Sequence, residues 1–279
     1  MLFDSEHLQA LLPLDLDDEY ITPSTLYQQP AADVPLVSGF TGLIQIFLCL
    51  MDLPEEAVGR PAINNSTAAE TQATDQYTTR PDYRVLKRMF DRVRYVLDDI
   101  APQMALWHGD WPKGEADHSI ADSDTRLDQL ESLRANLQVS RLWVRSMIFE
   151  RLLAIYHTFY TPKGPEAQAH ERSHWAERED ICEQLLVVLY NIKQKNLEPN
   201  GITLTYKIRQ VAATLLDCPF EEHTSISRRA RLYIERFMEL LTLLDKYSFQ
   251  DTQLVVWNDF DSAERRPVGD FMRLGTHGL

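Results

Sequence analysis

The chain has 279 residues, of which 44% are hydrophobic, and its formal net charge is −14. A chain of this length and composition can bury one substantial core, which favours a single main domain. The excess of negative charge argues against direct binding of nucleic acid, because affinity for a phosphate backbone comes largely from lysine and arginine.

The cysteines and the apolar runs indicate a reducing compartment and no membrane segment. Cys49, Cys182 and Cys218 are far apart in the sequence, so neither a disulfide framework nor a local cysteine metal cluster is expected. The first twelve residues carry acidic side chains where a signal peptide would be positive, and the run from Leu43 to Leu50 is too short to span a bilayer. We therefore expect a soluble intracellular protein.

The first 36 residues form an extended entry segment in this interpretation. The stretch from Leu14 to Pro35 is acidic and is interrupted by Pro23, Pro30 and Pro35, each of which disfavours helical geometry in the residue before it. This composition predicts extended chain lying over a surface.

A core helix is expected next. Val37 to Asp52 is apolar, has Gly39 and Gly42 near its start, and is followed by Pro54, a pattern typical of a buried helix with a close contact at its first turn. The following Glu55 to Arg80 is rich in small and polar residues and predicts a loop.

Two amphipathic elements follow. Pro81 to Pro102 carries apolar residues at three- and four-residue spacing, with Pro81 in the first turn. Glycine, proline and aspartate then break the pattern from Trp107 to Asp124. Thr125 to Phe159 keeps a helical phase over a long run, which fits either one curved helix or two helices in sequence.

Three more helices are expected after the Pro162-Lys163-Gly164-Pro165 turn. The first begins near Ser173 and is closed by Asn200-Gly201. The second offers Leu215 and Leu216 to the core before Pro219, and the third has a stripe from Ile226 to Leu244. The sequence therefore predicts an all-α fold, an irregular multi-helix domain over residues 37–247 with long loops.

Residues 248–279 are expected to be an irregular C-terminal tail. Aromatic residues alternate there with acidic ones, a composition found in activation segments that fold on a partner. A tail that packs back on the domain, or one that stays disordered, is an equally weighted alternative.

One short motif has the spacing of a zinc site. His170-Glu171-Arg172-Ser173-His174 matches the H-E-x-x-H pattern, in which two histidines bind zinc and the glutamate is the general base. Glu183 and Glu198 are conceivable third ligands. The upstream residues are polar or small and Pro165 is close, so the solvated start of a helix is the preferred interpretation, and the zinc-dependent hydrolase remains the alternative.

An acidic cluster is the second candidate site. Asp15, Asp17, Asp18 and Glu19 have the composition of a magnesium site for a diphosphate, but prolines surround them and no helical stripe follows, so a solvated loop is preferred. We find no phosphate-binding glycine loop and no nucleophile elbow. The sequence therefore predicts no catalytic residue, no cofactor and no metal.

Several stretches resemble one family, in that family's own order. They are the acidic segment from Leu12 to Tyr20, the helix end from Val96 to Pro102, the helix from Asn136 to Leu153, and the pair of helices from Trp175 to Asp217. They resemble the C-terminal part of the middle homology region in fungal binuclear-zinc-cluster transcription factors.

This resemblance implies an all-helical regulatory domain of a nuclear transcription regulator. It implies contacts with protein partners or with itself, a possible small-molecule effector, and no catalytic residues. The zinc-cluster DNA-binding domain, its basic linker and its coiled coil are not found in this sequence.

Three alternatives follow, each with its own structural expectation. A fragment of a longer regulator would expose an apolar face where further helices pack. A stand-alone relative that pairs with full-length regulators would use the same face in a dimer. A chain recruited as a small-molecule-binding helical protein would instead contain an enclosed pocket with convergent polar groups.

Overall fold

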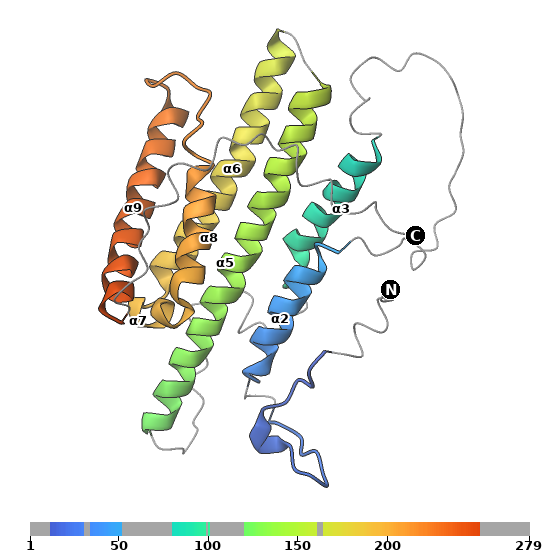
Figure 1. The fold of residues 1–279 in the computed structure, drawn as a ribbon, viewed down its shortest axis with the longest axis vertical. Coiled ribbons are helices and arrows are strands. Elements are labelled where there is room, and N and C mark those ends of the chain that lie inside the picture. Colours follow the sequence, from blue (N-terminus) through green and yellow to red (C-terminus); the bar gives the residue numbers. More distant parts are fainter. Residues whose placement is uncertain are drawn as a thin grey trace, which may run out of the picture.

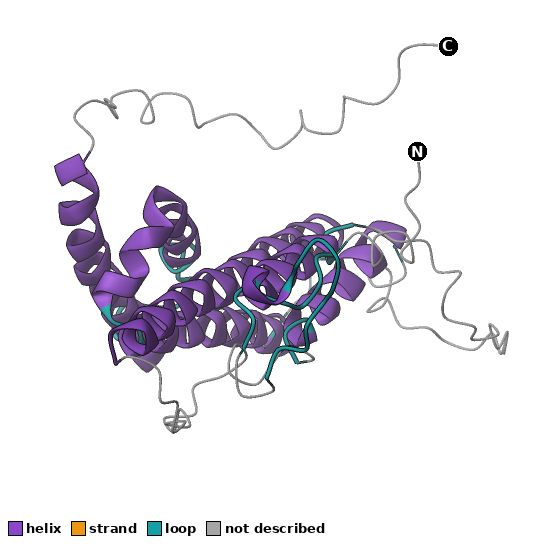
Figure 2. Ribbon diagram, turned by 90° about the horizontal axis from the view of Figure 1, so that it is seen from below, coloured by secondary structure: helices purple, strands orange, loops and turns teal. Residues whose placement is uncertain are grey.

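A computed structural model describes residues 12–30, 34–51, 80–98, 100, 120–160 and 164–251, without the side chains of residues 120–124 and 246–251. The fold is all-α, as predicted, and the described residues contain no β-strand beyond one isolated bridge between Ile21 and Leu26 (Figures 1 and 2). The helices are α2 (Val37–Leu48), α3 (Pro81–Tyr95), α5 (Ile120–Phe159), α6 (Pro165–Asn191), α7 (Gln194–Leu197), α8 (Gly201–Ala213) and α9 (Ser225–Asp251).

Helix α5 is the central element of the molecule. It is one continuous helix of 40 residues, which settles the choice between one helix and two, and it begins at Ile120, ahead of the predicted start. Its apolar residues lie on two opposite sides, with Val139 and Leu142 in one core and Val144 and Ile148 in the other. Helices therefore cover α5 on both sides, as Figure 1 shows.

On one side of α5, four helices form a closed ring. Helix α5 packs on α6 and α8, and α9 packs on both of these helices from the far side. Their shared core consists of fully buried side chains, among them Trp175, Leu185, Ile208 and Phe237. The short α7 and the 3-10 turn Glu198–Asn200 connect α6 to α8 and contact α5.

On the other side, α2 and α3 pack against α5 and enclose a second core. The two glycines of α2 are buried, as the sequence predicts for a close contact. A methyl group added to Gly39 would lie 3.1 Å from Leu133 Cβ, and one added to Gly42 would lie 2.5 Å from Ile100 Cδ1. These contacts place the first turns of α2 directly on α5.

The entry segment is held by Asp17. Its carboxylate accepts hydrogen bonds from the Leu36 backbone N–H at 2.7 Å, from Gln29 Nε2 at 2.9 Å and from Arg126 at 2.6 Å. The segment contains the 3-10 turn Asp18–Tyr20 and otherwise no helix among its described residues, in agreement with the extended chain predicted there.

Three predicted details are wrong. Helix α6 begins at Pro165, not near Ser173, because Gly164 adopts a positive φ of 68° and proline occupies the first turn. The same helix ends at Asn191, before Asn200-Gly201. Leu216 lies beyond α8 and is 68% exposed, although its neighbour Leu215 is fully buried.

Several other predicted elements end at or beyond the limits of the described ranges. Helix α3 ends at Tyr95 and passes into a turn, short of the predicted Pro102. Helix α9 continues to Asp251, past residue 248. The predicted loop from residue 55 to 79 and most of the predicted tail lie outside the described residues. No described helix is long and apolar enough to cross a membrane.

Candidate functional site

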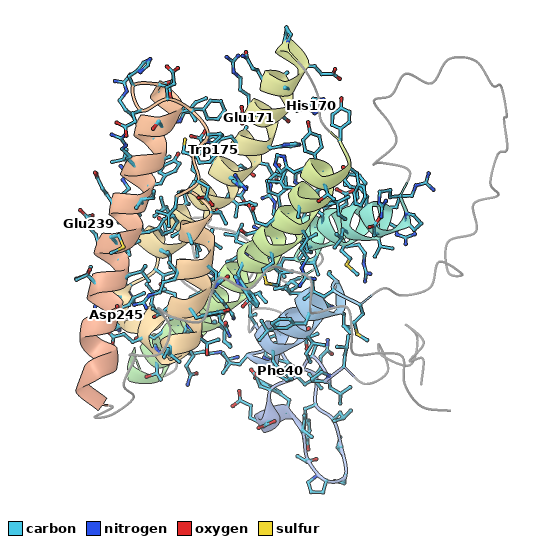
Figure 3. The ribbon with its side chains drawn as sticks, turned by 45° about the horizontal axis from the view of Figure 1, so that its top comes forward. Phe40, His170, Glu171, Trp175, Glu239 and Asp245 are labelled. Atoms are coloured by element: carbon cyan, nitrogen blue, oxygen red, sulfur yellow. The ribbon has the colours of Figure 1, made fainter. Side chains whose placement is uncertain are left out.

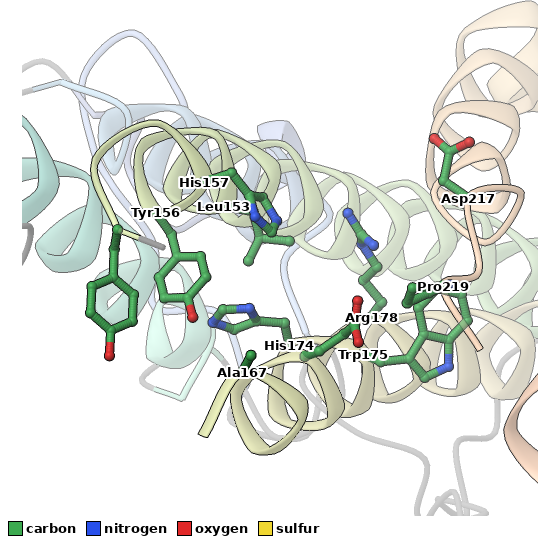
Figure 4. Close-up of a pocket in the computed structure, with 11 residues that line it drawn as sticks. Leu153, Tyr156, His157, Ala167, His174, Trp175, Arg178, Asp217 and Pro219 are labelled. Carbon is green, nitrogen blue, oxygen red and sulfur yellow. The ribbon is translucent and has the colours of Figure 1, made fainter. Parts of the chain in front are cut away.

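A cleft of about 490 Å³ opens between the last turns of α5 and the first turns of α6. We call it the histidine cleft. Side chains from both helices point into it, and the segment after α8 closes one end (Figure 4). Its lining residues are Leu153, Tyr156, His157, Tyr160, Ala167, Glu171, His174, Trp175, Arg178, Asp217 and Pro219.

Histidines from the two helices gather around Tyr156, which is buried. The ring of His174 packs edge-on against Tyr156 with their centroids 4.5 Å apart. The ring centroid of His170 lies 6.1 Å from that of His174. The ring centroid of His157, from α5, lies 6.5 Å from that of His174. The aromatic rings thus join the ends of the α5–α6 hairpin.

His174 is held in its neutral form. Burial, together with repulsion from the nearby His157, His170 and Arg178, lowers its pKa to about 4. At neutral pH this imidazole therefore offers a hydrogen-bond acceptor and a π-face to the cleft, without a charge.

The H-E-x-x-H motif lies inside α6, with Glu171 and His174 on the cleft wall. Among the described residues, no three His, Cys, Asp or Glu side chains come together as a group that could hold a metal ion. Glu183 is an implausible third ligand, because nine residues of helix separate it from His174 by about 13 Å. It lies instead near Tyr233 and Arg229 of α9.

The third histidine of the cluster, His157, was missed by the sequence reasoning. Its distance from the turn that the sequence predicts at Pro162-Lys163-Gly164-Pro165 was a usable signal, because residues equally far from such a turn face each other across antiparallel helices. Counting outward from that turn places His157 opposite the segment that carries His170 and His174.

Arginine side chains next to the cleft are paired within the protein. Arg178 donates two hydrogen bonds to Glu150, from Nε at 2.7 Å and from a terminal nitrogen at 2.6 Å. Arg145, only 1% exposed, contacts Glu177 and donates to Asp180 Oδ2 at 2.7 Å. These ion pairs connect α5 to α6, and they neutralise the two arginines, so little positive charge is available to bind a ligand.

The other charged candidates also have structural partners. Asp15 accepts a hydrogen bond from Ser38, and Asp17 has the three partners given above, so these carboxylates fix the entry segment. On α9, Arg229 forms an ion pair with Glu179 at 2.9 Å. The sequence predicts a solvated loop for the acidic cluster; Asp15, Asp18 and Glu19 are exposed, but the side chain of Asp17 is only 11% exposed because its partners cover it.

The three cysteines are free. Burial raises the pKa of the Cys182 thiol to about 12, and burial also raises the pKa of Cys49. Thiols in such surroundings stay protonated at neutral pH and are poor nucleophiles.

A second feature is an exposed apolar stripe on α2, here called the α2 face. It consists of Phe40, Ile44, Phe47 and Met51, spaced four, three and four residues apart; Ile44 is only partly exposed, and Met51 lies just beyond the end of α2. Phe40 is 54% exposed and Phe47 is 41% exposed. Phe40 and the histidine-bearing part of α6 are well separated in Figure 3.

The α2 face lies in an uncharged stretch of the sequence, which is unusual for this acidic protein. The eighteen residues from Val34 to Met51 contain no charged side chain, whereas the whole chain contains 70 charged residues in 279. Exposed apolar stripes without charge are the surfaces that proteins use for contacts with other proteins.

Comparison of the chain with protein-family models, with curated proteins and with solved structures found no match.

Proposed function

We propose that the chain is a regulatory interaction module of a transcription regulator, without catalytic activity, and that it associates with a second copy of itself through the α2 face. The observation that carries this proposal is the exposed, charge-free stripe of Phe40, Ile44, Phe47 and Met51. The family resemblance supports the link to transcription and a nuclear location.

Electrostatics favour this face for self-association. Two copies with a net charge of −14 repel each other, so they meet at least cost where charge is absent. A two-fold pair places the same apolar stripe on both sides, and each stripe covers the other.

The size of the face favours a weak, concentration-dependent dimer. A helix of twelve residues is about 18 Å long, and a standard stable interface buries about 800 Å² on each partner. The α2 face is smaller than such an interface, so we expect monomer and dimer to exchange in the micromolar range or above.

The oligomeric state tests the proposal. Sedimentation equilibrium of the wild-type protein should show a fraction of dimer that increases with protein concentration, and the Phe47→Glu variant should be monomeric. Leu216→Glu is the control, because Leu216 is an apolar side chain that is even more exposed than Phe47 but lies beyond α8, on the other side of α5. A wild-type protein that stays monomeric at high concentration, or a Phe47→Glu variant that still dimerises, contradicts it.

The regulatory part needs a separate test. When the chain is fused to a heterologous DNA-binding domain, we expect it to change expression of a reporter gene, and Phe47→Glu to reduce that change. Equal reporter expression with and without the fused chain would contradict a role in transcription.

The zinc content of the same purified sample, measured by elemental analysis, tests the alternative that the chain is a zinc-dependent hydrolase. We expect less than stoichiometric zinc. Stoichiometric zinc that is lost in His170→Ala would favour the hydrolase and direct attention to His174 and Glu171.

A further inference from the structure

We propose that the histidine cleft binds an organic cation, specifically an amine carried on an apolar or aromatic body. The inference is independent of the α2 face, since it concerns other residues at the other end of the helices. It rests on the shape of the cleft, on its charge, and on the chemistry of its walls.

The cleft has the size and composition of a small-molecule site. Its volume of about 490 Å³ lies within the range of about 300–1,000 Å³ in which proteins hold small ligands. Trp175 and Pro219 supply apolar wall at one end, and Tyr156, His157 and His174, with Leu153 beside His157, line the other end (Figure 4). An apolar body with a polar group fits such walls.

The charge of the cleft selects a cation. Glu171 and Asp217 line it, and neither forms a hydrogen bond or an ion pair in the described part of the chain. The positive charge of Arg178 is neutralised by its two hydrogen bonds to Glu150. The walls are therefore left with two carboxylates that lack a counter-charge, within a protein that is already strongly negative.

The histidines indicate where in the cleft the cation lies. Burial, the neighbouring histidines and Arg178 lower the pKa of His174 to about 4, so a positive charge is disfavoured next to this ring. The ammonium group therefore belongs beside Glu171 and Asp217, and the neutral imidazole contacts the apolar or aromatic body of the ligand. The ring of Tyr156, in contact with His174, extends the same aromatic surface.

Calorimetric titration with three ligands of one shape tests the inference. Phenethylamine, phenylacetate and 2-phenylethanol share a phenyl ring and differ in charge, and the protein is first dialysed against EDTA. We expect phenethylamine to bind at least about tenfold more tightly than phenylacetate, since charged hydrogen bonds discriminate by about that factor. The neutral alcohol should lie between the two. Equal affinity for the amine and the carboxylate would overturn the inference.

A conservative variant shows whether the cleft is the site. Glu171→Gln keeps the shape of an exposed side chain and removes its charge, so it should weaken phenethylamine binding about tenfold. Glu239→Gln is the matched control, because Glu239 is also exposed but lies on the outer face of α9 (Figure 3). Unchanged binding in Glu171→Gln, or absence of phenethylamine binding to the wild-type protein, contradicts the inference.

The two proposals fail separately. Phe47→Glu should change the oligomeric state and leave phenethylamine binding as in the wild type, whereas Glu171→Gln should do the reverse. A variant that altered both properties would contradict the independence of the two sites.

Discussion

The two sides of α5 differ in how completely they bury their apolar surface. On the bundle side, each of α5, α6, α8 and α9 packs on two others, and the ring of helices closes around one core. On the other side, α2 and α3 pack on α5 as an open layer (Figure 1). Helix α2 keeps Phe40 and Phe47 exposed to solvent.

Because of this difference, the apolar residues that stabilise the fold are not the ones that a partner could contact. A closed ring buries side chains from every direction, so its apolar residues stabilise the fold and are not available to a partner. An open layer stabilises the fold with one face and presents the other. Four predictions test this division, in order of decreasing effect.

The largest effect is expected in the centre of the ring. Leu185 is fully buried between α6 and its neighbours, and Leu185→Asp would bury a carboxylate without a partner. We expect a loss of more than about 4 kcal/mol, enough to unfold the domain. Circular dichroism during thermal unfolding measures it.

Val187→Asp is the control for this substitution. Val187 lies on the same helix but is 47% exposed, so the aspartate should stay in water and the melting temperature should change little. Similar melting temperatures for both variants would show that α6 does not face the core as described.

The second effect concerns the link between α5 and α6. Arg145→Met removes a fully buried guanidinium and leaves Glu177 and Asp180 without it. Because both carboxylates keep some access to water, we expect a loss of about 2–3 kcal/mol, below the range for a fully buried pair. Chemical denaturation by urea measures this free energy.

An exposed ion pair provides the comparison. An Arg209 guanidinium nitrogen and Asp245 Oδ2 lie 2.6 Å apart between α8 and α9, with the two side chains 51% and 35% exposed. Arg209→Met should therefore cost less than about 1 kcal/mol. If both arginine variants lost the same amount, the burial of Arg145 would have no energetic consequence.

The third effect tests the open layer itself. Gly42→Leu places a large side chain where even a methyl group would lie 2.5 Å from Ile100 Cδ1 and 3.0 Å from Leu137 Cδ1, so these side chains must repack or α2 must shift. We expect a loss of about 2 kcal/mol from overpacking, with the bundle intact. Hydrogen exchange should show faster exchange in α2 and unchanged protection in α6 and α8. Uniform loss of protection would mean that the two sides fold as one unit.

The helices could be predicted from the sequence where one side is apolar and a neighbour covers it. The stripe from Ile226 to Leu244 is buried or partly buried in α9, and Phe90, Val93 and Leu97 of the α3 region are buried as their spacing indicates. The close contact at Gly39 and Gly42 was also predictable, because two glycines four residues or fewer apart leave room for a second helix.

The start of α6 and the cleft could not be predicted in the same way. From Pro165 to His174 no residue is buried, because this first part of α6, next to its connection with α5, extends beyond the buried core, so no apolar stripe marks it. Its partner surface, with His157 and Tyr156, comes from a different helix. The spacing of residues within one helix does not show which residues of another helix will pack against it.

The smallest effect is expected from the titration of His174. Its pKa is lowered to about 4 in the folded protein, against about 6.5 in the unfolded chain, so the unfolded state binds the proton more readily. Its contribution is therefore present above pH 6.5 and is lost as the pH falls toward 4. The groups that face the ring are Tyr156 and His157 from α5, and His170 and Arg178 from α6.

The His174→Gln variant isolates this contribution from that of the other titrating groups. The variant lacks the ionisable ring, so its free energy of unfolding should fall less between pH 7 and pH 5 than that of the wild type. Because the ring is partly exposed, the difference should be on the order of 1 kcal/mol. If the free energy of unfolding changed with pH equally in the two proteins, the solvent in the cleft would shield His174 fully, and this end of the α5–α6 pair would be as accessible to water as the α2 face.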